Sequence, residues 1–300
     1  MTTTNASSTI QDSPLRRLSA ALYRRPRLVL GALLTPPVLW LVVIYLGSLS
    51  LLFISSFWHL DPINGIVRDP SLANFQEVLN PDKPYLRVAQ HTVGIAVIVT
   101  LADALLAFPL AYYMARVASP RTRSILFILA TIPLWISYLV RVYSWRIILA
   151  DGGFLDWALG GLGLKGPGAL GDVPIAIVFT YIWLPYMILP LYAGLERVPR
   201  SLLEASADLG ARQATTFRRI ILPLVLPALA AGSIFTFSLT LGDYIAPNLV
   251  SNNQFIGNVV LEQQGVSGNL PVAAAFALVP IAIMGIYLFI ARRLGAFEAL

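Results

Sequence analysis

Six apolar runs, each long enough to cross a lipid bilayer, limit what this chain can fold into. They occupy residues 28–56, 88–115, 124–145, 173–194, 223–247 and 271–291. A hydrocarbon core about 30 Å thick takes roughly 20 helical residues, and only helices or closed barrels satisfy the backbone inside lipid. Runs of this length are too long for barrel strands. The sequence therefore predicts an all-α integral membrane protein with six transmembrane helices, several of them kinked at proline.

The charged residues are few, and their distribution predicts the orientation in the membrane. Only 12% of the chain is charged, whereas soluble domains are about a quarter charged. Fifteen of the 21 Lys and Arg lie in the N-terminal tail, the second and fourth connections and the C-terminal end. Basic residues accumulate on the cytoplasmic side, so both termini are predicted to be cytoplasmic, with residues 1–27 as a tail and residues 28–300 as the membrane domain. The net charge of +6 then reflects topology rather than nucleic-acid binding.

The residues that most catalytic or metal sites need are missing. The chain has no cysteine and only two histidines, which lie far apart in the sequence. No Gly-Lys-Ser or Gly-Lys-Thr occurs, so the chain has no nucleotide-binding P-loop of its own. No nucleophile, base and acid stand in a recognisable pattern. We therefore expect a protein that is not an enzyme, binds no metal and binds no cofactor itself.

The fourth connection, about residues 195–222, is unusually rich in structure for a link between two spans. It reads SLLEASADLGARQATTFRRIILP from Ser201 to Pro223. Ser201 followed by Glu204 predicts a capping box at a helix start, and Gly210 suits the left-handed residue that ends a helix. A second helix is predicted from about residue 211 to a stop before Pro223. By these signals alone, the segment is either a helical hairpin lying on the membrane surface or a docking element for a partner.

The spacing within this connection resembles the EAA loop of binding-protein-dependent ABC importer permeases. That pattern is Glu-Ala-Ala, three residues, Gly, nine residues, then Ile-x-Leu-Pro, and this chain departs from it only at Ser206, where a small residue replaces another. The resemblance implies a short coupling helix that seats in a groove of a separate ATPase subunit. The residues assigned to it are Ser201, Glu204, Ala205, Ser206, Asp208, Gly210, Ile220, Leu222 and Pro223.

Further segments are similar to the spermidine/putrescine branch of these permeases: residues 139–159, 181–199, 232–250 and 257–275. The resemblance implies a type I ABC importer permease fold in a bacterial plasma membrane. It also implies a heterodimer with a second, homologous permease, two ATPase subunits that hold ATP and Mg, and an external solute-binding protein. The implied solute is a polyamine, with iron, thiamine, sulfate or an opine as alternatives. An ion-coupled secondary transporter is the rival class, but no internal repeat or proton relay supports it.

Polar and aromatic residues within the spans are candidates for the translocation pathway. Asp103 lies mid-span, where an ionised carboxylate costs about 2.5–3.5 kcal/mol, so it should have a partner or line a cation path. Asp243 is either an interfacial cap or part of an outer gate. The aromatic candidates either stack on an ammonium group or simply pack. Arg141 and Arg146 are expected to reach toward the interface or contact the binding protein. The pathway candidates are Asp103, Tyr181, Trp183, Tyr186, Asp243 and Tyr244.

Overall fold

The computed structural model describes residues 26–293, which divide into two compact units at residues 54 and 55. The helices of the first unit form one continuous apolar stretch. The elements are α2 (Pro26–Trp40), the π-helix η1 (Leu41–Leu46), α3 (Gly47–Ser55), β1 (His59–Asp61), β2 (Gly65–Val67), α4 (Ala73–Leu79), α5 (Tyr85–Tyr112), the π-helix η2 (Tyr113–Val117), α6 (Pro120–Thr131), the 3₁₀-helix η3 (Ile132–Trp135), α7 (Tyr138–Leu149), α8 (Phe154–Gly160), α9 (Asp172–Arg197), α10 (Arg200–Asp208), α11 (Gln213–Thr216), the π-helix η4 (Phe217–Ile221), α12 (Leu222–Gly242), α13 (Ile245–Val250), α14 (Ile256–Gly265) and α15 (Leu270–Arg293).

Five helical stretches in the described residues are long and apolar enough to span a membrane, and a bent pair makes a sixth. The five confirm the predicted spans to within a few residues, except that the stretch matching the predicted span 223–247 begins at Gln213 and ends at Gly242. The predicted tail 1–27 lies almost wholly outside the described residues.

The third predicted span, 124–145, is wrong as a single helix. The chain bends by 99° between η3 and α7. Pro133 has no N–H to donate, and the turn around it tightens to a 3₁₀-helix. Ile136 and Ser137 then take extended backbone conformations, which separate the two helices. The glycine-rich stretch that follows contains the short helix α8.

Helices α5, α9 and α12 form the centre of the second unit. Small residues allow α9 and α12 to approach closely: a Cβ added to Gly194 would lie 2.4 Å from the Cβ of Ala228. A Cβ on Gly232 would lie 2.7 Å from the sulfur of Met187. In lipid, such close approach is what drives helices together. The small residues of α12 at this contact are thus packed within this chain's own bundle.

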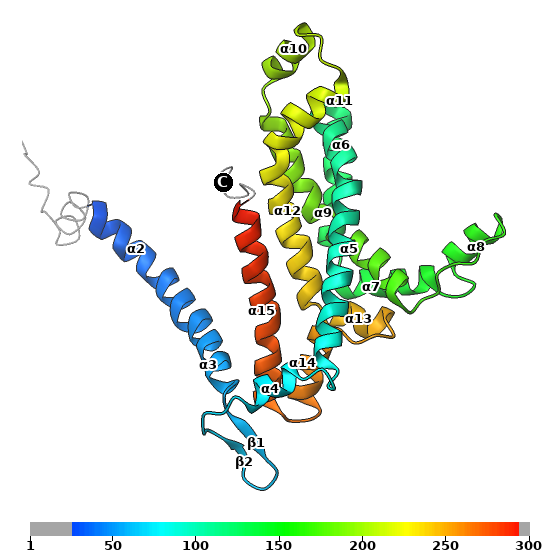
Figure 1. Cartoon of the computed structure of the whole chain (residues 1–300). Coiled ribbons are helices and arrows are strands. Elements are labelled where there is room, and N and C mark those ends of the chain that lie inside the picture. The colour runs from blue at the N-terminus through cyan, green and yellow to red at the C-terminus, as the bar shows by residue number, and fades with distance from the viewer. Residues whose placement is uncertain (1–25, 294–300) are drawn as a thin grey trace, which may run out of the picture. The chain divides into compact units, whose positions relative to one another are not determined.

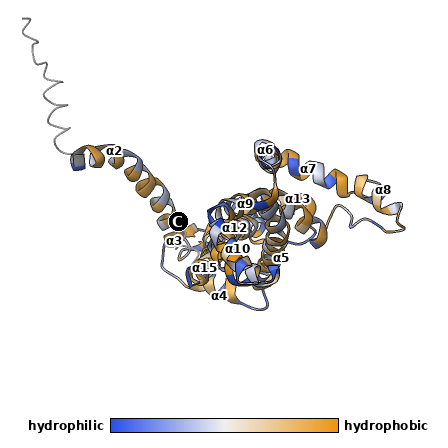
Figure 2. Cartoon of the chain, turned by 90° about the horizontal axis from the view of Figure 1, so that it is seen from above, coloured by the Kyte–Doolittle hydropathy of each residue, from blue (hydrophilic) through white to orange (hydrophobic). Residues whose placement is uncertain are grey.

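The second unit has two distinct ends (Figure 1). Helices α10 and α11 lie at one end, while α4, α14 and the antiparallel hairpin of β1 and β2 lie at the other. Asp61 closes the hairpin by accepting hydrogen bonds from the amides of Asn64 at 2.7 Å and Ile63 at 2.8 Å. These two bonds hold the pKa of the Asp61 carboxyl below its usual range. Figure 2 shows apolar residues on outward faces of the helices, as lipid-facing helices require.

Candidate functional site

The helical loop, residues 199–221, connects α9 to α12 and begins at a proline. Pro199 has an extended backbone (φ −63°, ψ 136°) and stands at the N-cap position of α10. Ser201 therefore lies inside the first turn of the helix, and no side chain caps that end. The predicted capping box of Ser201 and Glu204 is wrong, because the proline follows the end of α9 and the new helix starts two residues earlier than the serine pattern suggests.

The other end of α10 closes as the sequence predicts. Gly210 has a φ of +73°, the left-handed conformation that glycine adopts without strain. Its N–H donates to the carbonyl of Ala207 at 2.8 Å, and the N–H of Ala211 donates to the carbonyl of Ser206 at 3.0 Å. These two bonds form a Schellman motif. The prediction for Gly210 is confirmed.

The second arm of the loop does not stop at Pro223. Helix α11 runs into η4 and then into α12, so the helix continues past Pro223 as one stretch from residue 213 to residue 242. The predicted stop is wrong. A proline lacks the N–H of a regular turn and its ring clashes with the preceding turn, and the wider π-helical turn directly before it gives the ring room.

Contacts inside the loop fix its two arms against each other and against the bundle. The hydroxyl of Ser206 is hydrogen-bonded to that of Thr216 at 2.7 Å, and Ser206 is buried. Phe217 packs edge-on against Phe108 of α5, with ring centroids 5.3 Å apart. Leu203 packs on the same apolar cluster. The departure from the family pattern at residue 206 therefore supplies the bond between the arms.

The outward side of α10 combines charged, small and apolar groups. Glu204 and Asp208 are exposed, as are Ser201 and Ala205. Leu209, just beyond the helix, is 88% exposed. In the second arm Ile220 and Leu222 are half-buried, and Pro223 is exposed. A capped helix with this mixture of residues presents a surface that another protein can cover.

Two arginines, which in the sequence indicate only topology, hold the start of the loop. Arg116 donates to the carbonyl oxygens of Leu195 and, at 2.6 Å, of Val198. Arg123 pairs with Glu196 at 3.3 Å. Cations suit the carbonyls at a helix C-terminus, so these residues fix where α9 ends and α10 begins. No motif marks them in the sequence.

Asp103 lies in the middle of α5 with no exposed surface. Neither carboxyl oxygen has a hydrogen-bond partner among residues 26–293. The predicted partner is therefore not found within the described part of this chain. Two buried threonines lie in the same region and are weakly bonded to each other, Thr236 to Thr100 at 3.4 Å, but neither bonds to Asp103.

Asp243 makes several hydrogen bonds, in contrast to Asp103. One oxygen accepts from the amides of Ile245 at 2.7 Å and Ala246 at 3.1 Å, which start α13. The other oxygen accepts from the hydroxyl of Tyr138. The Tyr138 ring in turn stacks on Trp183, with centroids 5.9 Å apart. Asp243 thus acts as a cap and as a link to α7, and its role in a pathway stays a prediction.

The remaining pathway candidates make local aromatic contacts. Tyr181 lies against Trp145 at 5.2 Å between centroids, and Tyr186 against Phe235 at 6.4 Å. Tyr244 is exposed. The structure brings Asp243 and Trp183 together through Tyr138, while no hydrogen bond joins Asp103 to them.

Arg141, which we expected to reach toward the interface or to contact the binding protein, is buried within this chain. It is only 7% exposed, and its guanidinium carbon lies 5.8 Å from the centre of the Tyr138 ring. Among the described residues, no three His, Cys, Asp or Glu side chains are placed to hold a metal ion.

Known proteins match this chain in sequence and in fold. The family described as "Binding-protein-dependent transport system inner membrane component" matches residues 107–296. The chain is 45% identical over 302 residues to the inner membrane ABC transporter permease protein YdcU of Escherichia coli K12, covering 95% of this chain and 96% of that protein. It is 33% identical over 266 residues to the spermidine/putrescine transport system permease protein PotB of the same strain, covering 85% and 93%.

A solved structure shares the fold. A chain of the bacterial alginate ABC transporter, in complex with an alginate pentasaccharide-bound periplasmic protein, superposes with a TM-score of 0.73 at 15% identity, covering 92% of this chain and 96% of that one. At this identity the likeness concerns the fold alone. The family match covers well over half of the chain. This chain is therefore an ABC transporter permease, a multi-pass inner-membrane transport subunit that belongs to the family of binding-protein-dependent transport system inner membrane components.

Proposed function

We propose that this permease subunit forms part of the translocation pathway of an ATP-driven importer for a small cationic solute, a polyamine such as spermidine or putrescine. The observation that carries this proposal is the similarity to PotB, which extends over most of both chains. The name of YdcU, which is more similar in sequence, states no solute. Permeases for iron, thiamine or opines remain the alternative class.

We further propose that α10 couples this permease to ATP hydrolysis on a separate ATPase subunit, which holds ATP and Mg. Three features support this role: the exposed outward side of α10, the Schellman closure at Gly210 and the anchoring of the loop by Arg116. Because both ends of α10 are fixed, a displacement of this helix by a partner is passed on to α9 and α12 and is not lost in a local rearrangement.

The proposed assembly contains a second, homologous permease, two ATPase subunits and an external solute-binding protein. The arrangement of basic residues supports cytoplasmic termini and a cytoplasmic helical loop. The alginate transporter was solved with its periplasmic binding protein, which supports the same kind of partnership here.

The solute is tested with the reconstituted complex in proteoliposomes. We expect ATP-dependent uptake of radiolabelled spermidine that unlabelled putrescine reduces and unlabelled thiamine does not. Uptake that is driven by a proton gradient in the absence of ATP would contradict the ATP-driven importer and favour a secondary transporter. ATP-dependent uptake of another solute, with no uptake of spermidine, would support the importer function and contradict the polyamine as its solute.

The coupling role is tested by crosslinking. Cysteine at Ala205, which is exposed on α10, should crosslink to cysteines placed on the ATPase subunit. Cysteine at Ile63, which is 92% exposed in the hairpin at the opposite end of the unit, is the matched control and should not. No crosslink from Ala205 to any ATPase position, with the complex intact, contradicts the coupling role.

A further inference from the structure

The buried guanidinium of Arg141 lacks partners for two of its nitrogens. Arg141 lies on α7 and is 7% exposed, and its Nε and Nη1 atoms make no hydrogen bond within residues 26–293. Arginine is always charged in proteins, and a buried charge without hydrogen-bonded partners is strongly unfavourable. Its contact with the face of the Tyr138 ring, 5.8 Å from the ring centre, offsets only part of that cost. In this arrangement the cation therefore lacks a counter-charge.

The carboxylate of Asp243 lies at the hydroxyl end of the same tyrosine. Its Oδ2 accepts from the Tyr138 hydroxyl, and its Oδ1 accepts from two amides at the start of α13. Among the ion pairs of the described residues, none joins Asp243 to Arg141. Two other carboxyl groups fit less well: Asp172 is already bonded to a histidine and an asparagine, and Asp103 is bonded to no residue of the described chain that contacts Arg141. Asp243 is therefore the natural counter-charge, kept from Arg141 by Tyr138.

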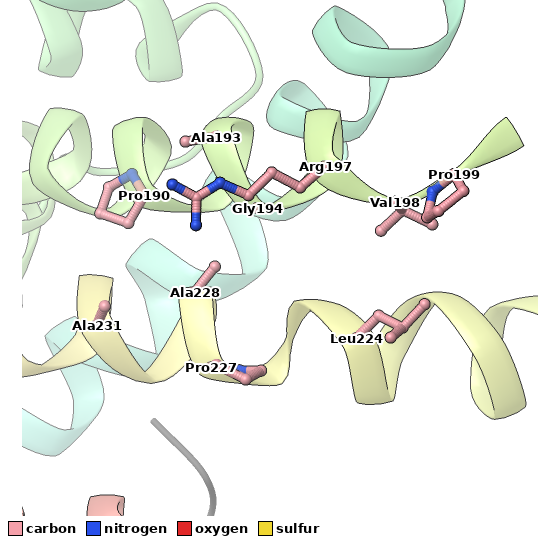
Figure 3. Close-up of a pocket in the computed structure, with 10 residues that line it drawn as sticks. All are labelled: Pro190, Ala193, Gly194, Arg197, Val198, Pro199, Leu224, Pro227, Ala228 and Ala231. Atoms are coloured by element: carbon pink, nitrogen blue, oxygen red, sulfur yellow. The ribbon is translucent and has the colours of Figure 1, made fainter. Parts of the chain in front are cut away.

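Helix α7, which carries both Tyr138 and Arg141, is built to move as one piece. The residues directly before it, Ile136 and Ser137, and the residue directly after it, Ala150, have non-helical backbone conformations. Such residues at the ends of an element absorb the backbone changes of a hinge. By contrast, α9 is held against α12, where Gly194 meets Ala228 (Figure 3). Helix α7 is therefore free to shift while α9 and α12 stay together.

We propose that Arg141 and Asp243 form a direct ion pair in a second state of the permease, in which Oδ2 of Asp243 exchanges the hydroxyl of Tyr138 for the guanidinium of Arg141. The two α7 residues are three positions apart and share one face of the helix. A shift of α7 by about 4.5 Å, the rise of three residues, is enough for the exchange. Oδ1 keeps its two amide bonds, so the start of α13 stays capped. Helix α7 then has two positions, each held by one bond to Asp243.

The exchange is tested without ATP by pulsed EPR on the complex in lipid nanodiscs. Spin labels are attached to cysteines placed at Val140 on α7 and Asn248 on α13, both exposed, in a chain that has no cysteine of its own. Tyr138→Phe removes the hydroxyl that competes for Oδ2, so it should raise the ratio of a second label distance to the first about tenfold. Adding Arg141→Gln should abolish that rise. Adding Arg87→Gln, which removes an exposed arginine of α5, is the matched control and should not.

The connection of this exchange to ATP rests on the proposed importer function. In the parent complex, ATP with vanadate should produce the same second distance. Arg141→Gln should reduce uptake about tenfold without lowering the unfolding temperature, because the Nε and Nη1 atoms have no bond to lose in this structure.

The outcomes separate the exchange from the importer function. An unchanged distance in Tyr138→Phe, a second distance that survives Arg141→Gln, or a lowered unfolding temperature in Arg141→Gln overturns the exchange. Loss of the second distance on adding Asp103→Asn to Tyr138→Phe would make Asp103 the partner and also overturn it. A second distance that appears in Tyr138→Phe but never with ATP in the parent complex would support the exchange and contradict its connection to ATP hydrolysis.

Discussion

The two ends of the bundle formed by residues 55–293 are held together in different ways. At the loop end, the hydrogen bond between the arms joins Ser206 to Thr216, ten residues apart, and the long-range bonds are made by two arginine side chains, Arg116 to Val198 and Arg123 to Glu196. At the opposite end, backbone amides make bonds to residues that are distant in the sequence. The amide of Ile256 donates to the hydroxyl of Thr92 at 3.1 Å, across 164 residues, and the amide of Gly171 donates to the carbonyl of Val250 at 2.9 Å.

This difference indicates what each end is built for. The two arms of the helical loop are bonded to each other and expose an outward face, so under the coupling proposal we expect the loop to move as one unit. At the opposite end, hydrogen bonds link α14 to α5, the start of α9 to α13, and α7 to the start of α13, so a change there disturbs several helices at once. Substitutions at the opposite end should therefore lower stability, and substitutions in the loop should lower transport with less loss of stability.

The largest loss of stability is expected from Asp243→Ala. The change removes three hydrogen bonds and leaves two amides at the start of α13 without an acceptor. The expected cost is about 2–4 kcal/mol, measured as thermal unfolding in detergent. Tyr138→Phe removes one of the three bonds and keeps the ring on Trp183, so it should cost about 1 kcal/mol.

Asp243→Asn separates this structural role from a role in the pathway. The amide oxygen can still accept from the two backbone amides, so the loss of stability should be smaller than with alanine. A fall in uptake at an unchanged unfolding temperature would show that the negative charge itself is needed, as a gate for a cation requires. Unchanged stability in the alanine variant contradicts the comparison of the two ends.

The second prediction concerns Gly257 in α14. A Cβ there would lie 2.9 Å from the carbonyl oxygen of Asp243 and 3.0 Å from the Cβ of Tyr244. Gly257→Ala should therefore cost about 1–3 kcal/mol through the shift it forces on backbone atoms. Gly265→Ala in the same helix is the control, because a Cβ there meets nothing within 4 Å. Equal effects of the two changes would mean that the opposite end is not tightly packed.

The third prediction moves to the loop. Gly210→Val puts a branched side chain at a φ of +73° with open space around it, so the cost is conformational and about 1–3 kcal/mol. Because the strain lies in the turn that orients α10, uptake should fall more than the unfolding temperature does. Gly210→Asn should restore much of the activity, since asparagine tolerates the left-handed conformation. Normal transport by the valine variant contradicts the coupling role.

Local sequence signals predicted the turn at Gly210, misjudged two positions near prolines, and reported none of the contacts between distant residues. The turn at Gly210 follows from one residue and its flanks. The predicted cap at Ser201 is wrong because Pro199 takes the N-cap position, two residues earlier. The break after Pro133 was missed because apolar residues continue on both sides of it. The bond from Tyr138 to Asp243 joins residues 105 positions apart, and no local pattern reports such a contact.

The fourth prediction tests whether the loop is a unit of its own. Ser206→Ala and Thr216→Val each remove one side of the bond between the arms, and each should cost about 1 kcal/mol. The double variant should cost less than the sum of the two, because both changes remove the same interaction. Strict additivity in a double-mutant cycle would mean that contacts other than this hydrogen bond hold the two arms together.

The smallest effect is expected from Asp103→Asn, in the middle of the bundle and away from both ends. The side chain has no exposed surface, and neither oxygen has a partner in the described residues. A negative charge there would cost about 2.5–3.5 kcal/mol with nothing to offset it. A neutral side chain of the same shape should therefore fit as well, changing the free energy of unfolding by less than about 0.5 kcal/mol.

Uptake by the Asp103→Asn variant decides the role of this residue. If Asp103 serves only in packing, uptake of the solute should match that of the parent protein. Asp103→Leu, which removes the polar atoms as well, should then be neutral or slightly stabilising, because it leaves no buried group without a partner. If uptake is lost in Asp103→Asn while the unfolding temperature is unchanged, the carboxylate is charged during transport. In that case α5 lines the cation path, and the centre of the bundle at Asp103 is a functional site in addition to its two ends.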